Sequence, residues 1–174
     1  SIVFASPLLS TSRWLEDTNR LKRELPLDVQ NAITINEERG TTDADDYKNA
    51  SQEFDKRFRY GIWPFPEEAQ RAGREIGIDV YMTMWGPSEF YCTGNLKDYD
   101  CTSRLHELEI PVLFTCGRYD EATPETVEQF QRLISGSEMV VFENSAHHSQ
   151  LTESERYLST VRNFLRQVEL GSPP

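Results

Sequence analysis

The chain has 174 residues, 37% of them hydrophobic and 27% charged, and its formal net charge is −11 at pH 7. This length and composition indicate one globular domain with a real core. Nucleic acids and anionic membranes repel an acidic surface, so we expect neither as a partner. A cationic substrate is compatible with the charge, although solubility alone explains it. The apolar runs fall far short of the roughly 20 residues of a membrane helix, and the start lacks the basic region of a signal peptide.

The three cysteines, Cys92, Cys101 and Cys116, do not have the spacing of metal ligands. Cys116 lies in an apolar run and is expected to be a small buried side chain. Cys92 and Cys101 could pair, but an odd total without a signal peptide favours a reduced, cytoplasmic protein. We expect no metal and no organic cofactor.

The first half of the chain combines one strand with several polar helices. Residues 2–5 form a compact apolar run that predicts a central parallel strand. A first helix is expected to stop near Pro26, because proline cannot continue a helix. Helices are also expected over 43–60 and 67–76. The helix over 43–60 is the better defined, because four of its apolar residues recur at helical spacing: Tyr47, Ala50, Phe54 and Phe58.

The second half alternates strands with helices, which predicts a parallel sheet and an α/β fold. The expected strands and helices cover residues 110–116, 124–134, 138–142 and 152–168. Thr152 and Glu155 resemble a capping box at the start of the last helix. Its apolar stripe comprises Tyr157, Leu158, Val161, Phe164, Leu165 and Val168.

Asp120 follows the strand over 110–116 within the sequence Gly-Arg-Tyr-Asp-Glu-Ala-Thr-Pro. In open parallel sheets, catalytic groups lie at the carboxyl ends of strands. A carboxylate there can hold an imidazole in one tautomer and stabilise its protonated form. The alternative is an aspartate that forms a turn or caps the helix at 124, and this segment alone does not decide between the two interpretations.

His147 follows the strand over 138–142 through a short loop and could serve as a general base. A lone loop histidine is more often a surface residue, and His148 is its neighbour. However, an acid and then a histidine after successive strands is the order of an α/β-hydrolase triad. The Gly-x-Ser-x-Gly turn of the nucleophile is absent, so we expect a serine on polypeptide outside this chain. His106 lies in a polar stretch and is interpreted as structural.

Two glutamates could recognise a cation near this pair. Glu89 lies in a Gly-Pro loop between aromatic residues, and Glu121 directly follows Asp120. A solvated loop glutamate is the default interpretation. A partly buried carboxylate, in contrast, needs a positive partner. Two of them converging near a nucleophile would favour a substrate with a free amino group.

At these residues the chain resembles the prolyl aminopeptidases, or proline iminopeptidases. The similarity covers nearly the whole chain and rests most on residues 82–90, Met-Thr-Met-Trp-Gly-Pro-Ser-Glu-Phe, and residues 117–124. Further matching stretches are residues 93–100, 110–113 and 136–142. The family's His-Gly-Gly-Pro-Gly segment and Gly-x-Ser-x-Gly-Gly turn are absent. The family histidine is usually followed by a hydrophobic residue, where this chain has His148.

The resemblance implies the C-terminal portion of an α/β-hydrolase fold with an inserted helical cap. Residues 1–9 would be a strand of the hydrolase core, 10–90 the cap, and 91–174 the rest of the core. Asp120 and His147 would be the triad acid and histidine, and Glu89 with Glu121 would bind the amino terminus of the substrate. The aromatic residues expected near the specificity pocket, although they could equally be cap core, are Trp85, Phe90 and Tyr91.

We therefore expect a serine aminopeptidase that releases proline or other small apolar residues from peptides or amino-acid amides. It would be complete only with the N-terminal half of the same hydrolase. Two alternatives remain open. One is a non-catalytic binding or regulatory fragment, and the other is an esterase or amidase that does not require a free amine.

Overall fold

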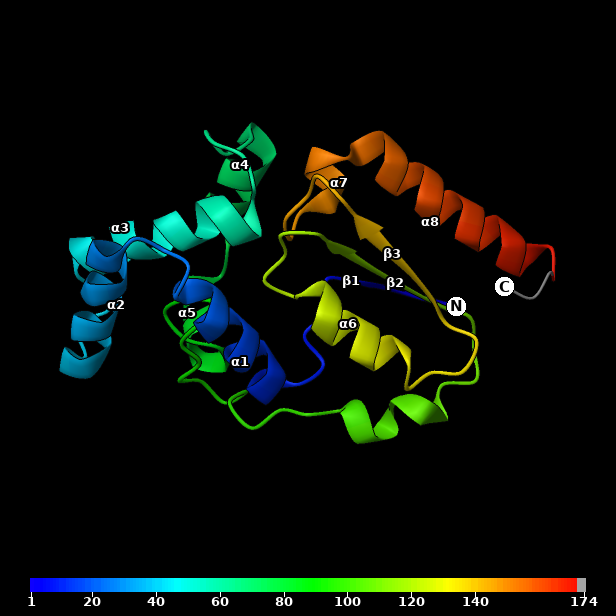
Figure 1. Cartoon of the computed structure of the whole chain (residues 1–174), viewed down its shortest axis with the longest axis horizontal. Coiled ribbons are helices and arrows are strands. Elements are labelled where there is room, and N and C mark those ends of the chain that lie inside the picture. The colour runs from blue at the N-terminus through cyan, green and yellow to red at the C-terminus, as the bar shows by residue number, and fades with distance from the viewer. Residues whose placement is uncertain (172–174) are drawn as a thin grey trace.

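The computed structural model describes residues 1–171 and contains a small sheet beside a group of helices (Figure 1). The strands are β1 (Ile2–Ala5), β2 (Val112–Gly117) and β3 (Glu138–Phe142). The α-helices are α1 (Thr11–Lys22), α2 (Leu27–Arg39), α3 (Asp45–Phe54), α4 (Glu67–Glu75), α5 (Ile78–Met84), α6 (Pro124–Gln131), α7 (Ser149–Thr152) and α8 (Ser154–Glu169). A π-helical turn, η1 (Asp55–Arg59), follows α3, and a 3₁₀ helix, η2 (Thr102–Glu107), precedes β2.

The sheet is parallel with the strand order β1-β2-β3, as the alternating pattern predicts. All six residues of the central strand β2 are buried. Helices α6 and α8 lie on opposite sides of the sheet (Figure 1). The loops after β2 and β3 point toward the helices α1 to α5, so the carboxyl ends of these strands lie at the junction of the two regions (Figure 1). The predicted parallel α/β architecture is confirmed.

Several element boundaries differ from the predictions. Helix α1 ends at Lys22, and a further helix, α2, follows Pro26. Only Ile33 and Asn36 of α2 are buried, so its sequence has no apolar stripe from which it could be predicted. The helix expected over 43–60 is α-helical only to Phe54 and continues as the π-helical turn η1. Its four predicted apolar residues are all buried.

The predicted capping box at the last helix is wrong. Thr152 belongs to α7, and its hydroxyl donates to Ser145 Oγ at 2.8 Å. The N-cap of α8 is Glu153, which makes no side-chain capping hydrogen bond. The apolar stripe is only partly covered, because Phe164 is buried whereas Leu158 is 49% exposed. A 16-residue helix spans about 24 Å, and the five residues of β3 span only about 17 Å, so the sheet cannot cover it all.

Two hydrophobic clusters form the core. One surrounds the sheet and includes Trp14 and Trp85, while the other lies among α1, α2 and α3 and includes Phe90. Trp14 and Trp85 belong to the expected cap, residues 10–90, but they pack in the cluster around the sheet. The packing therefore does not separate a cap from a hydrolase core, and the domain boundaries at residues 9 and 90 stay a prediction.

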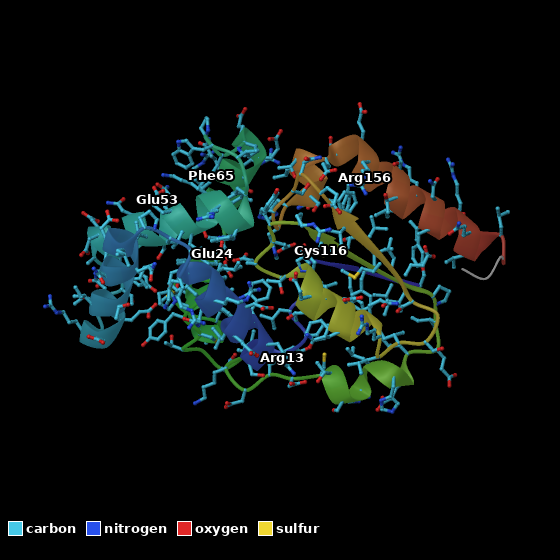
Figure 2. The ribbon with its side chains drawn as sticks, in the orientation of Figure 1. Arg13, Glu24, Glu53, Phe65, Cys116 and Arg156 are labelled. Atoms are coloured by element: carbon cyan, nitrogen blue, oxygen red, sulfur yellow. The ribbon has the colours of Figure 1, made fainter. Side chains whose placement is uncertain are left out.

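Cys116 is fully buried inside the molecule, as expected (Figure 2), and Cys92 and Cys101 are free thiols. Within residues 1–171 no helix combines the length and the apolar character that crossing a membrane requires.

Candidate active site

The structure brings Asp120 and His147 into contact at the carboxyl ends of β2 and β3. His147 Nδ1 lies 2.9 Å from Asp120 Oδ1. The Asp120 side chain is fully buried, and the His147 side chain is 22% exposed. With its proton on Nδ1 and donated to Asp120, the imidazole keeps Nε2 free to accept a proton from another group.

Three further donors surround the Asp120 carboxylate. Oδ2 accepts the Ser6 hydroxyl at 2.6 Å and the Gly117 N–H at 3.1 Å, while Oδ1 accepts the Ala122 N–H at 2.8 Å. Charge-assisted hydrogen bonds of this kind fix the orientation of a buried carboxylate. The alternative interpretation, in which Asp120 caps the following helix, is wrong. The N-cap of α6 is Thr123, whose side chain accepts the Thr126 N–H at 3.4 Å.

His148 is not placed to replace His147. Its Nδ1 lies 3.1 Å from Gln150 Nε2, and its ring stacks on Tyr60 with the ring centroids 4.9 Å apart. Burial, together with the charge of His147, lowers the pKa of His148 to about 4, so its imidazole is neutral near pH 7. Of the two histidines, the structure therefore brings His147 to Asp120.

Glu121 is 1% exposed and approaches the same nitrogen of His147, with its Oε1 3.8 Å from Nδ1. Its Oε2 is buried without a hydrogen-bond partner among the described residues. Burial, followed by the nearby charge of Glu89, raises the pKa of Glu121 well above its usual range. A buried carboxylate without a partner is costly, so this oxygen is a place where a cationic ligand would be stabilised.

Glu89 is the second carboxylate of this region, and its side chain is 14% exposed. Its Oε1 accepts the Tyr81 hydroxyl at 2.9 Å and lies 3.3 Å from Arg59 Nη1. Trp14 connects the Glu89 loop to the histidine. Its indole N–H donates to the Glu89 carbonyl at 2.8 Å, and its ring contacts His147 edge-on with centroids 5.8 Å apart.

A cavity of about 620 Å³ opens beside His147 and Glu89. Its wall is mainly apolar and includes Leu8, Trp14, Ile76, Val80, Met84 and Trp85. Trp85 borders this cavity and is in edge contact with Trp14. Phe90 and Tyr91 instead pack in the cluster among α1, α2 and α3.

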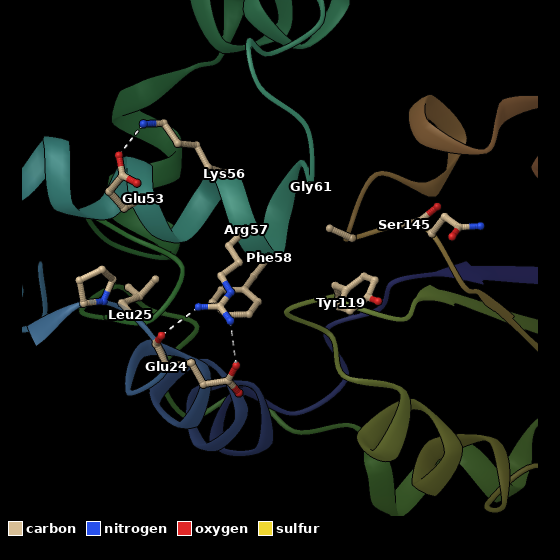
Figure 3. Close-up of a pocket in the computed structure, with 12 residues that line it drawn as sticks. Glu24, Leu25, Glu53, Lys56, Arg57, Phe58, Gly61, Tyr119 and Ser145 are labelled. Atoms are coloured by element: carbon tan, nitrogen blue, oxygen red, sulfur yellow. Dashed lines mark hydrogen bonds and ion pairs between the residues drawn. The ribbon is translucent and has the colours of Figure 1, made fainter.

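A second cavity of about 600 Å³ lies between η1 and the loops after β2 and β3 (Figure 3). Its charged side chains already have partners. Arg57 donates to the Glu24 carbonyl at 2.9 Å and lies 3.5 Å from the Glu24 carboxylate, and Lys56 pairs with Glu53. This cavity therefore offers no unpaired charge to a ligand.

Sequence reasoning missed four residues of the site, namely Ser6, Trp14, Arg59 and Tyr81. Ser6 had a partial signal, because it directly follows the predicted strand over 2–5. Arg59 and Tyr81 reach Glu89 only through the packing of separate helices, which the sequence pattern does not reveal. No group of three or more His, Cys, Asp or Glu residues that could hold a metal ion occurs within residues 1–171.

No protein-family model matches the chain. The proline iminopeptidase of Heyndrickxia coagulans is 45% identical over 169 residues, which are 97% of this chain and 59% of that protein. The solved structure of the Mycobacterium smegmatis proline iminopeptidase matches with a TM-score of 0.87 and 31% identity, over 98% of this chain and 57% of that one. The structure of VinJ matches with a TM-score of 0.90 and 36% identity, over 95% of this chain and 56% of that one.

The chain thus spans a little more than half the length of the curated relatives that it matches. The resemblance predicted from residues 82–90 and 117–124 is confirmed, and so is the α/β-hydrolase fold class. Over nearly its whole length this chain is therefore similar to part of the proline iminopeptidases, and it shares their α/β-hydrolase fold.

Proposed function

We propose that this chain supplies the acid, the histidine and the amine-binding carboxylates of a serine aminopeptidase. One observation carries the proposal: His147, bonded to Asp120, borders the same apolar cavity as Glu89. Next to His147 lies Glu121, whose buried Oε2 has no hydrogen-bond partner within residues 1–171. The names of the relatives support a peptidase that acts at an amino terminus. The nucleophilic serine would come from polypeptide outside this chain, in keeping with the part of the relatives that the chain does not span.

In this mechanism the serine attacks the carbonyl carbon of the first residue of the substrate. His147 Nε2 takes the serine proton and then gives it to the leaving amine. Asp120 holds the imidazole in the required tautomer and stabilises it while it is positively charged. Water then releases the amino acid from the serine ester, again with His147 as the base.

The substrate would be a peptide or an amino-acid amide with a free amino terminus. Glu89 and Glu121 would hold its ammonium group, because a cation relieves the cost of keeping two carboxylates in a buried region. The side chain of the first residue would enter the apolar cavity of about 620 Å³. Proline and other small apolar residues are suited to such a wall.

The test uses the longer protein that contains this chain together with its nucleophile segment. We expect it to hydrolyse the p-nitroanilides of proline and alanine, and to hydrolyse N-acetylated versions far more slowly. His147→Ala should abolish this activity. His106→Ala is the matched control, because His106 is exposed on η2 and should leave the rate unchanged.

Three results would contradict the proposal. If N-acetylated substrates react as fast as free ones, the enzyme is an esterase or amidase without amine recognition. If His147→Ala keeps the wild-type rate, the histidine assignment is wrong. Activity that survives serine-directed phosphonates would argue against a serine nucleophile.

A further inference from the structure

The π-helical turn η1 ties the cap helices to both loops of the candidate site. The Tyr60 N–H donates to the Asp55 carbonyl at 2.9 Å, which is the five-residue spacing of a π-turn. The Phe58 carbonyl accepts the N–H groups of Glu121 at 3.2 Å and of His147 at 3.3 Å. Phe58 itself is buried. The backbone of η1 is therefore fixed against the loop after β2 and the loop after β3.

This fixed turn places the Arg59 side chain between two carboxylates. Arg59 Nη1 lies 3.3 Å from Glu89 Oε1 and 3.6 Å from Asp55 Oδ2, and its side chain is 28% exposed. Burial alone would lower the pKa of Arg59, but the charges of Glu89 and Asp55 raise it. The guanidinium therefore remains positively charged at every pH at which the protein is folded.

Negative groups outnumber this cation. Asp55, Glu89 and Glu121 interact with one another and with Arg59. Burial raises the pKa of Asp55 to about 7, although Arg59 acts in the opposite direction. The other titratable groups that face this cluster are Tyr60, Tyr81, Asp120, His147 and His148. His147 is already bonded to Asp120, and the pKa of His148 is lowered to about 4, whereas Arg59 is a permanent cation in contact with Glu89.

We propose that Arg59 is a positioning residue that holds the Glu89 carboxylate in place for the amino group of the substrate. Without a neighbouring cation, carboxylates this close together retain protons, because like charges disfavour ionisation. A cluster that retains protons would attract an ammonium group less strongly. Arg59 therefore acts through Glu89 and not on the reacting atoms. This inference rests on the proposed function, since it assumes that Glu89 receives the substrate amine.

The experiment measures kcat and KM against pH in the longer protein for two substrates, alanine p-nitroanilide and its des-amino analogue, propionyl p-nitroanilide. Arg59→Gln removes the charge, Arg59→Lys keeps it, and Arg57→Gln is the matched control. Arg57 lies in the same turn but points to the second cavity, where it pairs with Glu24 (Figure 3). Circular dichroism and thermal melting verify that each variant is folded.

Burial raises the pKa of Asp55 and of Glu121, and Arg59 acts in the opposite direction, so these two carboxylates ionise only at higher pH when Arg59 is removed. For the alanine substrate we expect the acid limb of kcat/KM to move up by about one pH unit or more in Arg59→Gln. Its KM at pH 6 should rise by roughly tenfold to a hundredfold, with a smaller change in kcat. Arg59→Lys should stay within a few-fold of wild type. The des-amino substrate should keep its acid limb in all variants.

The outcomes separate this inference from the function on which it rests. If the wild-type enzyme does not prefer alanine p-nitroanilide to the des-amino substrate, the proposed function fails. If it does, but Arg59→Gln keeps the wild-type KM and acid limb, the role of Arg59 is overturned. If Arg59→Gln does not fold, the Arg59→Lys variant tests the inference instead. Lysine keeps the positive charge, so a lysine variant that no longer prefers alanine p-nitroanilide to the des-amino substrate would contradict a role based on charge. Because Arg59 acts through Glu89, the double variant Glu89→Gln/Arg59→Gln should have the same KM as the single variant Glu89→Gln.

Discussion

Two cavities of nearly equal volume, about 620 and 600 Å³, flank the loop that carries His147. The first has apolar walls and borders Glu89 and His147, next to the unpartnered carboxylate of Glu121. The second is lined by Lys56, Arg57 and their carboxylate partners (Figure 3). Volume does not distinguish them. The difference lies in polar groups that are buried but not satisfied, since these are the groups that a ligand can stabilise.

The two carboxylates next to His147, those of Asp120 and Glu121, also differ in how fully they are hydrogen-bonded. Asp120 accepts four hydrogen bonds, from Ser6, Gly117, Ala122 and His147. Its neighbour Glu121 has an oxygen that accepts none from residues 1–171. A fully bonded carboxylate is suited to hold an imidazole in place, whereas an unbonded one is suited to receive a cation. Adjacent residues thus have environments that favour different roles.

The largest expected effect comes from changing Asp120, the carboxylate that accepts four hydrogen bonds. Asp120→Asn keeps the shape of the side chain but replaces an acceptor with an amide, so His147 would lose its favoured tautomer. We expect kcat for alanine p-nitroanilide in the longer protein to fall by about four orders of magnitude. Glu24→Gln is the control, because Glu24 lies at the second cavity and should leave kcat within a few-fold. A loss smaller than tenfold for Asp120→Asn would contradict the assignment.

The second prediction concerns Gly117, the last residue of β2. A Cβ at this position would overlap the carbonyl oxygens of Ser145 and Ala146, which are backbone atoms and cannot move aside. Gly117→Ala should therefore lower the free energy of unfolding by about 3 kcal/mol, measured by urea denaturation. Gly73→Ala in α4 meets no neighbouring atom and should instead gain about 1 kcal/mol. Equal stabilities for the two variants would contradict this packing.

The contact between Asp120 and His147 was predictable from the sequence, because it depends on the arrangement of the sheet. Asp120 and His147 follow buried apolar strands, and parallel strands bring their carboxyl ends to one edge. Arg59 was not predictable, because it reaches Glu89 through a π-turn that has no sequence signature and through the packing of separate segments. Ser6 adopts a left-handed backbone with φ of 47°, which is unusual for serine. Helix α2 was missed because only two of its residues are buried.

The smallest expected effect comes from changing Glu121, the other carboxylate of this comparison. Burial raises the pKa of Glu121, so the folded protein holds its proton more tightly than the unfolded chain does. Stability from this group is fully present below its ordinary pKa of 4.5 and is lost as pH rises through the raised pKa. Glu121→Met removes this loss. At pH 8 it should therefore gain about 1–2 kcal/mol in the free energy of unfolding, and less at pH 5.

Glu53→Met at the second cavity is the matched control for this prediction. Glu53 is 47% exposed and paired with Lys56, so its removal should change stability by no more than about 0.5 kcal/mol at either pH. In the longer protein, Glu121→Met should also lose its preference for a free amine over an acetylated one. A variant that is destabilised at pH 8 would mean that the Glu121 carboxylate is stabilised by its surroundings, and the contrast with Asp120 would then disappear.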